Sequence, residues 1–381
     1  KMILSKEHEL MRKNFRNFAE TEFTTEIQEQ LDREGGFNWD IWKKIAKYGF
    51  AGTKIPVEYG GQGGDYLAYA LMNEEFARVC PVLAIYANTP NSLGGGPLLQ
   101  CGNKEQLEKY LTPAAKGEKH IVFALTEPGA GSDPGSMITR ATADGDYYVL
   151  NGRKCFISGA PIADYAIVYA RTNPELKGAK GISMFIVDMH LDGVSCGKPE
   201  PKMGINGYPT SDIVFENVRV HKSDLLGPLD KGYAVAMKTL DGGRLGVAAQ
   251  SLGIAQGALE EAIAYAKERK QFGKPISYNQ GVSFMLADMA TEIEAARNLI
   301  YSAAQAKDMD AKDASTQCSM AKYYASEMAN RVCAKAIQIH GGYGFIKDYK
   351  VERLYRDARV MTLYEGTSQV QQIVISRSLL K

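Results

Sequence analysis

The hydrophobic periodicity of the sequence changes twice, and this order of patterns limits the folds that the chain can adopt. Residues 1–119 carry helical patterns separated by breakers. Residues 120–227 carry short, closely spaced apolar runs, which predict an antiparallel sheet or a small barrel. Residues 228–381 return to helical spacing rich in small residues, which predicts a helical bundle. The expected class is α+β, with an N-terminal α-helical domain (1–119), a middle β-domain (120–227) and a C-terminal helical bundle domain (228–381).

Three elements within these zones can be placed more closely. A helix is expected from Trp39 to Tyr48, because apolar residues form one stripe there and Gly49 can end it. The Asp144-Gly145 dipeptide before the apolar run 147–150 predicts a β-hairpin. A long helix is expected from 245 to 270, with a basic last turn that matches the helix dipole.

Composition and charge exclude several classes of function. The 381 residues carry a net charge of +1 without a block of one sign, so no nucleic-acid partner is expected. No apolar run approaches the ~20 residues of a spanning helix, and residues 1–20 lack the apolar core of a signal peptide. The six cysteines form no C-x-x-C pair, and no His/Cys cluster has zinc spacing. We therefore expect a cytoplasmic protein with reduced thiols, no metal and no membrane contact.

The common nucleotide-binding motifs do not fit this chain. The glycine-rich segments 60–64 and 129–131 do not lie between a strand and a helix of a βαβ unit, which a Rossmann site requires. Neither a Walker A sequence nor an H-E-x-x-H motif is present. A nucleotide cofactor would need a different kind of site.

Four other segments each have a structural and a chemical interpretation. Segment 125–133 follows a predicted strand, and its small residues let a ligand approach the backbone. Segment 155–159 ends a strand in Ser158 and Gly159, where the Ser158 hydroxyl either donates to a ring nitrogen of a ligand or caps a turn. Segment 268–273 has basic residues that match a helix dipole or clamp an anion. Glu365, before Gly366-Thr367, is a helix-start acid or a general base. Taken singly, each segment leaves both interpretations open.

Together and in this order, the segments resemble the acyl-CoA dehydrogenase family over nearly the whole chain. The matching blocks are L-T-E-P-G-A-G-S-D from Leu125, E-R-x-x-F-G from Glu268, Q-x-x-G-G-x-G from Gln338 and Y-E-G-T from Tyr364. The resemblance is nearest to the short- and medium-chain, butyryl-CoA dehydrogenase-like branch. It implies a C-terminal four-helix bundle, FAD as cofactor, a homotetramer and electron-transferring flavoprotein as redox partner.

The resemblance also implies a role for individual residues. Glu365 is the implied catalytic base. Arg269 is implied to clamp the FAD pyrophosphate, and Gln338, Gly341 and Gly342 are implied to meet the FAD of a neighbouring subunit. The full implied cofactor set is Phe123, Leu125, Thr126, Phe156, Ile157, Ser158, Arg269, Phe272, Gln280, Gln338, Gly341, Gly342, Thr367 and Gln369. The implied substrate set is Ser132, Asp241, Arg244, Tyr86, Thr89, Leu240, Tyr364 and Gly366.

The implied reaction is removal of the acyl-CoA α-proton by Glu365 while the β-hydrogen leaves as hydride for flavin N5. A glutamate starts near a pKa of ~4.3, and a dry pocket raises that pKa and makes the group a better base. The family's second base position, on a bundle helix, corresponds here to Gly243, which cannot take a proton. The Glu365 backbone N–H and a flavin ribityl hydroxyl are implied donors to the thioester oxygen.

The acyl group and the direction of reaction stay open at this level. Short straight-chain acyl-CoA is the first expectation, and an aryl-propionyl or cyclic acyl-CoA is the second. Tyr86 can shorten the acyl pocket or stack on an aromatic acyl group. In anaerobes such enzymes run as enoyl-CoA reductases with reduced flavoprotein as donor. An acyl-CoA oxidase and a non-enzymatic assembly protein are the competing classes.

Overall fold

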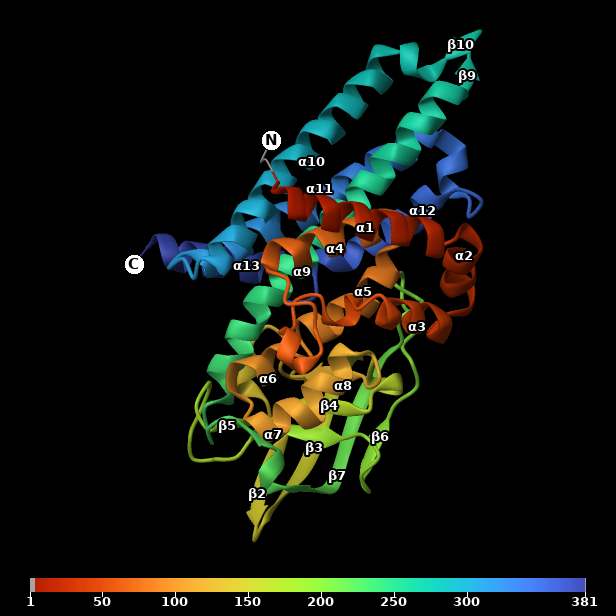
Figure 1. Cartoon of the computed structure of the whole chain (residues 1–381). Helices are drawn as coiled ribbons and strands as arrows, with labels where there is room; N and C mark the ends of the chain where they lie inside the picture. The colour runs from red at the N-terminus through yellow and green to blue at the C-terminus, as the bar shows by residue number, and fades with distance from the viewer. Residues whose placement is uncertain (1–3, 381) are drawn as a thin grey trace.

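The computed structural model describes residues 4–380, in which helices come first, a sheet second and long helices last (Figure 1). The helix predicted near Trp39 is confirmed, and Gly49 takes the left-handed conformation after its end. No helix among residues 4–380 is long and apolar enough to span a bilayer. The N-terminal helices are α1 (Lys6–Glu22), α2 (Thr25–Glu34), α3 (Trp39–Lys47), α4 (Tyr66–Val79), α5 (Pro81–Asn91), α6 (Gly96–Cys101), α7 (Lys104–Gln106) and α8 (Thr112–Ala115).

The middle of the chain forms one sheet with the order β6-β7-β3-β2-β4-β5-β8, and β1 pairs with β4. The predicted hairpin is confirmed, because Asp144 pairs with Tyr147 across a turn in which Gly145 has a φ of 62°. The expected antiparallel pairing holds for most of the sheet, but β1 lies parallel to β4 after a long connection through β2 and β3, and β2 meets β4 in parallel at one position. The strands are β1 (Ile121–Ala124), β2 (Arg140–Asp144), β3 (Tyr147–Ser158), β4 (Tyr165–Arg171), β5 (Ile182–Asp188), β6 (Val194–Cys196), β7 (Thr210–His221) and β8 (Leu225–Leu226).

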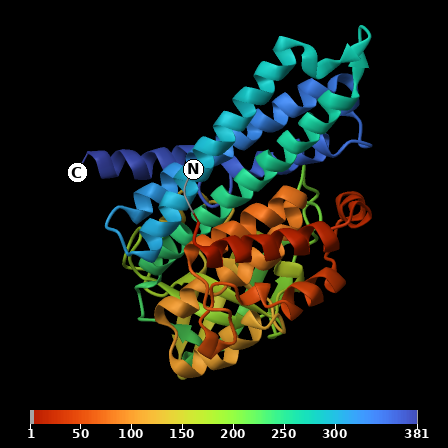
Figure 2. The ribbon, with the colours of Figure 1, turned by 45° about the horizontal axis from the view of Figure 1, so that its top comes forward.

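Three long helices form the last part of the chain, and α9 with α10 extends as an arm at one end of the molecule (Figure 2). The predicted helix end at Lys270 is wrong. Helix α9 stops at Glu268, and a small hairpin follows, because Phe272 and Gly273 both take a positive φ as a tight hairpin turn requires. The elements are α9 (Gly232–Glu268), β9 (Lys270–Gln271), β10 (Lys274–Pro275), α10 (Gln280–Asp308), α11 (Ala314–His340), α12 (Lys350–Arg359) and α13 (Ser368–Leu379).

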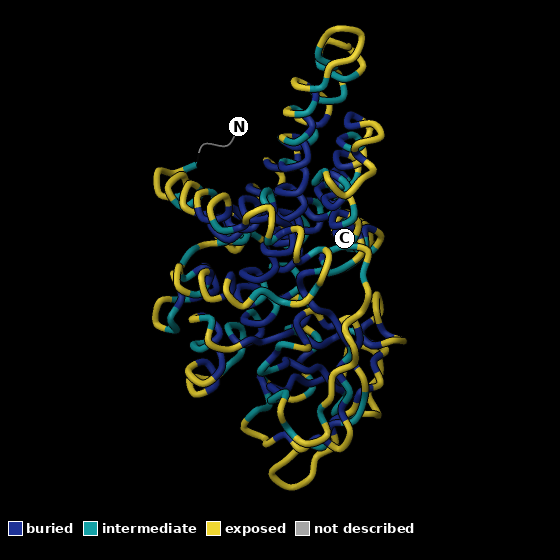
Figure 3. Tube along the Cα trace, turned by 90° about the vertical axis from the view of Figure 1, so that its right-hand side faces the viewer, coloured by how far each residue is buried: buried dark blue, intermediate teal, exposed yellow. Residues whose placement is uncertain are grey.

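Helix α9 contacts α4, α10 and α11, and its residues 243–259 are buried apart from Gln256. Figure 3 shows that the buried parts of the trace lie at the centre of the molecule, with exposed segments around them. Two glycines allow the close approach to α4. A Cβ at Gly253 would lie 2.3 Å from the Glu74 carbonyl oxygen, and one at Gly257 would lie 2.4 Å from that of Arg78. The two backbones therefore meet almost directly, which fixes the position of α9 against the N-terminal helices.

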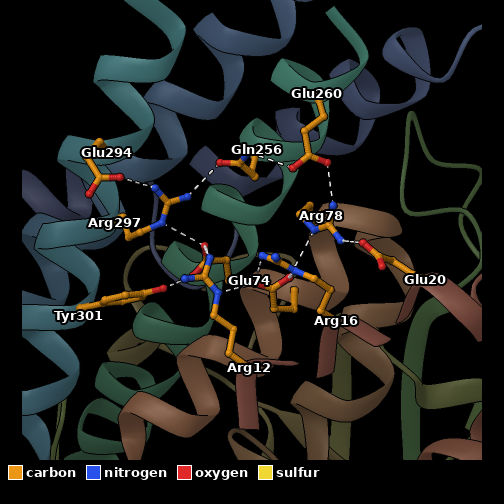
Figure 4. Close-up of polar contacts among 11 residues, drawn as sticks. Arg12, Arg16, Glu20, Glu74, Arg78, Gln256, Glu260, Glu294, Arg297 and Tyr301 are labelled. Carbon is orange, nitrogen blue, oxygen red and sulfur yellow. Dashed lines mark hydrogen bonds and ion pairs between the residues drawn. The ribbon is translucent and has the colours of Figure 1, made fainter. Parts of the chain in front are cut away.

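Buried acidic groups on α4 join that helix to α1 and α10 (Figure 4). The Glu74 carboxylate accepts hydrogen bonds from Arg297 (3.1 Å), Arg12 (3.2 Å) and the Tyr301 hydroxyl (2.5 Å). Its neighbour Glu75 accepts from Arg12 at 2.6 Å. Since buried carboxylates are stable only when paired and hydrogen-bonded, these contacts lock the helices into one arrangement.

Candidate active site

Glu365 lies in a tight turn between α12 and α13, and its backbone conformation is unusual. Its φ is 53° and that of Gly366 is 91°, so two consecutive residues occupy the left-handed half of conformational space. Thr367 is the N-cap of α13, where its side chain accepts a hydrogen bond from Val370. Glu365 therefore precedes the cap and does not lie in the first turn of the helix. For the non-glycine Glu365 this conformation costs about 1–3 kcal/mol, and such strained residues are typical of functional sites, whereas Gly366 adopts a positive φ without that penalty.

The turn directs the Glu365 carboxyl group onto α9 at Gly243. A Cβ on Gly243 would lie 1.8 Å from Glu365 Oε2 and 3.1 Å from Leu93 Cδ2. Any side chain at position 243 would occupy the space of the carboxyl group. The structure thus brings Glu365, the expected base, next to Gly243, which occupies the second base position implied by the family resemblance and carries no side chain.

The environment of the Glu365 carboxyl group favours proton transfer near neutral pH. Its Oε2 is buried and has no hydrogen-bond partner among residues 4–380. Burial raises the pKa of Glu365 to about 7, although the positive charges of Lys322 and Arg244 oppose the rise. A carboxyl group with an unused oxygen and a pKa near 7 is suited to act as a general base or acid.

Two cations, Arg244 and Lys322, act on this carboxyl group through their charge. Arg244 is buried and donates to Asp241 at 2.7 Å, while its Nε has no partner among the described residues. Lys322 is fully buried and donates from Nζ to the Gly366 carbonyl oxygen at 2.7 Å. The sequence analysis missed Lys322, although its position in the apolar stripe of α11, beside Cys318 and Ala325, is a signal that could have identified it.

Several residues expected around the acyl group already use their polar groups in hydrogen bonds within the protein. The Tyr86 hydroxyl donates to the Gly207 carbonyl oxygen and accepts from the Asn38 N–H, each at 2.8 Å. Thr89 donates to the Ile85 carbonyl oxygen, and Tyr364 donates to Gln250 at 2.6 Å. Leu240 is half-buried on α9, whereas Ser132 is exposed in the loop after β1. The polar end of Tyr86 is thus not free to contact a ligand.

Two of the expected flavin-lining segments meet at the ends of β1 and β3. The Cys155 N–H donates to the Thr126 carbonyl oxygen at 2.9 Å. Phe156 has a φ of 56° and is 69 % exposed, and Ser158 is also exposed. The Ile157 side chain, in contrast, is buried in the sheet core. The Ile157 side chain is therefore covered by protein and is not available to contact a cofactor. Phe123 is half-buried, and Leu125 is buried.

A buried ion pair, also missed from the sequence, fastens these two segments together. Lys154 on β3 is fully buried and donates to the Leu125 carbonyl oxygen (2.9 Å) and to Glu127 (2.8 Å). The Glu127 carboxylate in turn accepts from the N–H groups of Ile138 and Thr139. The loop after β1 is thereby held against β3.

Lys154→Met is expected to lower the free energy of unfolding by about 3–5 kcal/mol, because it leaves the buried Glu127 carboxylate without its cation. Thermal unfolding followed by calorimetry measures the loss. Arg153→Met is the matched control, since Arg153 is 60 % exposed and its pair with Asp212 should contribute less than about 1 kcal/mol. Equal losses in the two variants would contradict the assignment.

A second group of expected cofactor residues gathers at the far end of the bundle. Arg269, Gly341 and Gly342 line one cavity of about 480 Å³. Arg269 lies over the Tyr343 ring and forms no ion pair within residues 4–380. The hairpin that carries Phe272 and the sheet lie at opposite ends of the molecule (Figure 1). Besides Phe156 and Ser158, the exposed members of the expected cofactor set are Phe272, Gln280, Gln338, Gly341, Gly342 and Gln369.

The structure is that of an α+β protein with a helical domain, a sheet domain and a helical bundle, in which Glu365 Oε2 is buried and has no partner among residues 4–380. Family models agree along the whole chain: the acyl-CoA dehydrogenase N-terminal domain matches residues 5–118, the middle domain 122–218 and the C-terminal domain 230–380. The chain belongs to the acyl-CoA dehydrogenase family. It is accordingly an FAD-dependent oxidoreductase.

Individual relatives are similar over their full length. A subunit of the caffeyl-CoA reductase–Etf complex of Acetobacterium woodii is 58% identical over 380 residues, covering 100% of both chains. The 3-(aryl)acrylate reductase of Clostridium sporogenes is 56% identical with the same coverage. The solved structure of butyryl-CoA dehydrogenase from Megasphaera elsdenii is 41% identical, covers 100% of both chains and superposes with a TM-score of 0.96.

Proposed function

We propose that the protein transfers hydrogen across the α,β bond of an acyl-CoA thioester and that Glu365 moves the α-proton. The observation that carries this proposal is the buried Oε2 of Glu365, which has no hydrogen-bond partner among the described residues, on a carboxyl group whose pKa burial raises to about 7. FAD, when bound, supplies the hydride acceptor or donor. The chain's own residues then transfer the α-proton and orient the substrate.

The flavin residues fall into two sets that support a cofactor shared between two subunits. In one set, the segments near Thr126 and Ser158 would hold the flavin ring, with Lys154 fixing their spacing. In the other, Arg269 would grip the pyrophosphate of a neighbouring copy's FAD together with Gly341, because the two line the same cavity. This extends the expectation for Gln338, Gly341 and Gly342 to Arg269. A homotetramer in the cytoplasm fits this proposal.

Substrate binding would place the thioester between Glu365 and the flavin. Arg244 and Asp241 would flank the CoA arm, and the Glu365 backbone N–H would donate to the thioester oxygen as it gains charge. In the oxidative direction the Glu365 carboxylate removes the α-proton. In the reductive direction the protonated Glu365 returns it.

We propose an aryl-acrylyl-CoA as the substrate, reduced to the aryl-propionyl-CoA with electrons from reduced electron-transferring flavoprotein. Identities of 58% and 56% to two reductases named for aryl-acrylate or caffeyl substrates, against 41% to a butyryl-CoA dehydrogenase, support this order. It reverses the preference for a short straight-chain substrate. The name of the first relative also supports the electron-transferring flavoprotein as partner.

A substrate panel tests the proposed acyl group. Stopped-flow bleaching of the flavin is expected to be at least about tenfold faster with 3-phenylpropionyl-CoA than with butyryl-CoA, a difference of about 1.4 kcal/mol in activation free energy. Octanoyl-CoA is the control for general hydrophobicity. A butyryl-CoA optimum would restore the short-chain assignment.

The pH dependence should have opposite signs in the two directions. Oxidation requires the Glu365 carboxylate, so its rate should rise as the pH increases through about 7, where burial places the pKa of Glu365. Reduction requires the protonated carboxyl group, so its rate should fall over the same range. Single-turnover rates from pH 5.5 to 8.5, a window of about 1.5 units on either side of that pKa, measure both limbs. The same sign in both directions would argue against Glu365 as the proton carrier.

A further inference from the structure

Lys322 on α11 is a buried cation that the reaction described so far does not use. It is 0 % exposed, and its Nζ donates to the Gly366 carbonyl oxygen at 2.7 Å. No carboxylate forms an ion pair with it within residues 4–380. An ammonium group without compensation is costly to bury. Its retention behind the Glu365 turn therefore calls for a compensating charge nearby.

The compensating charges come from two carboxyl groups that act on Lys322 through space. Burial lowers the pKa of Lys322 to about 8, while the charges of Glu365 and Glu327 act to raise it. Glu327 is already committed, because it accepts a 2.5 Å hydrogen bond from Ser368 at the start of α13. Glu365 has no such partner on Oε2. The charges of Lys322 and Glu365 therefore favour each other through space, without a direct ion pair among the described residues.

The turn that carries Glu365 also needs a mechanical anchor, since Glu365 and Gly366 both have a positive φ. Two side chains provide it. Lys322 binds the Gly366 carbonyl oxygen, and Gln371 on α13 donates to the same oxygen at 3.0 Å and to the Glu365 carbonyl oxygen at 3.3 Å. Only Lys322 adds a charge to this anchor.

We propose that Lys322 is a positioning residue for Glu365. Its ammonium group binds the Gly366 carbonyl oxygen, which holds the Glu365–Gly366 turn in place, and its charge stabilises the Glu365 carboxylate. The inference rests on the proposed role of Glu365. Lys322 itself touches neither substrate nor the reacting atoms. It acts through the Gly366 carbonyl group and through its field at the Glu365 carboxyl group.

The other groups that face Glu365 do not duplicate this role. Arg244 on α9 is the second cation, but its guanidinium is paired with Asp241. Tyr69 on α4 and Tyr364 are the remaining titratable groups, and burial raises the pKa of both phenols, so they stay neutral at physiological pH. Lys322 is therefore the cation near Glu365 that no ion pair occupies among the described residues.

Lys322→Met and Gln371→Met, compared in FAD-loaded protein, test the proposal. Methionine at 322 removes the charge and one of the two anchors of the Gly366 carbonyl group, whereas methionine at 371 removes anchors and no charge. The pH profile of flavin bleaching by 3-phenylpropionyl-CoA should move upward by about one pH unit in Lys322→Met, because an opposite charge nearby favours the carboxylate. Gln371→Met should lower the rate without moving the midpoint.

A second variant and a second readout keep the test independent of folding and of turnover. Lys322→Gln retains a donor for the Gly366 carbonyl oxygen without the charge, and should give the same upward shift. The infrared carboxyl band of Glu365, identified by its loss in Glu365→Gln, should persist to higher pH in both Lys322 variants. An unmoved midpoint and band in both, or an equal shift in Gln371→Met, would overturn the proposal. Full turnover of Glu365→Gln would instead overturn the proposed base.

Discussion

Glu365→Gln is expected to lose about 10²–10⁴-fold in the rate of flavin reduction by acyl-CoA, because an amide cannot take the α-proton. The substitution preserves size and leaves the backbone turn unchanged, so the nearby cofactor residues Thr367 and Gln369 should keep their positions, and the residues expected around the flavin ring lie on other segments. The purified variant should therefore keep its flavin absorbance. Stopped-flow spectroscopy with 3-phenylpropionyl-CoA measures the rate.

The control for this experiment is Glu108→Gln, the same chemical change at a residue that is 60 % exposed. It should leave the rate unchanged. A Glu365→Gln variant that reduces its flavin at a near-normal rate would remove Glu365 from the mechanism. A variant that loses FAD would show instead that the side chain supports cofactor binding.

Gly243→Ala is expected to lower the same rate by about 10²-fold through crowding alone, since misplacing a reacting group by about 1 Å has that effect. The added Cβ would lie 1.8 Å from Glu365 Oε2, so the carboxyl group must move away from its position. Helix propensity points the other way: alanine in a helix interior is favoured over glycine by about 1 kcal/mol. Lost activity with retained stability would thus separate geometry from folding.

Its neighbour provides a matched control. A Cβ on Gly242 would meet the Tyr66 ring at 3.6 Å, an ordinary van der Waals contact. Gly242→Ala should therefore keep its rate and should not lower its melting temperature, since alanine is favoured over glycine in a helix interior. If Gly243→Ala is equally active, the carboxyl group has room that the structure does not show, and the close contact with α9 is not essential.

The sequence predicted the order of domains because periodicity reports burial, and burial differs plainly between helix and strand zones. It also led to Glu365 through the ordered motifs. It did not reveal the parallel pairing of β1, because strand pairing depends on partners distant in sequence. The hairpin after Arg269 was missed because its turn places a non-glycine residue, Phe272, at positive φ.

The buried lysines were missed for a related reason. A lysine is usually exposed, so Lys154 and Lys322 were assigned no role from their residue type alone. What gives them a role is the carbonyl group that each one meets, at Leu125 and at Gly366, and those meetings are set by tertiary packing. A lysine within an apolar helical stripe, as at 322, is a signal that sequence analysis can use in other chains.

The glycine contact between α4 and α9 has a consequence for how such a protein can diversify. Because Gly253 and Gly257 bring the two backbones together, the helices cannot slide apart or closer without losing that contact. The distance between α4 and the helix that carries Gly243 is a fixed dimension of the scaffold. New acyl specificities must then arise by exchanging side chains on a constant backbone frame. A small number of side-chain substitutions is therefore enough to change the substrate range.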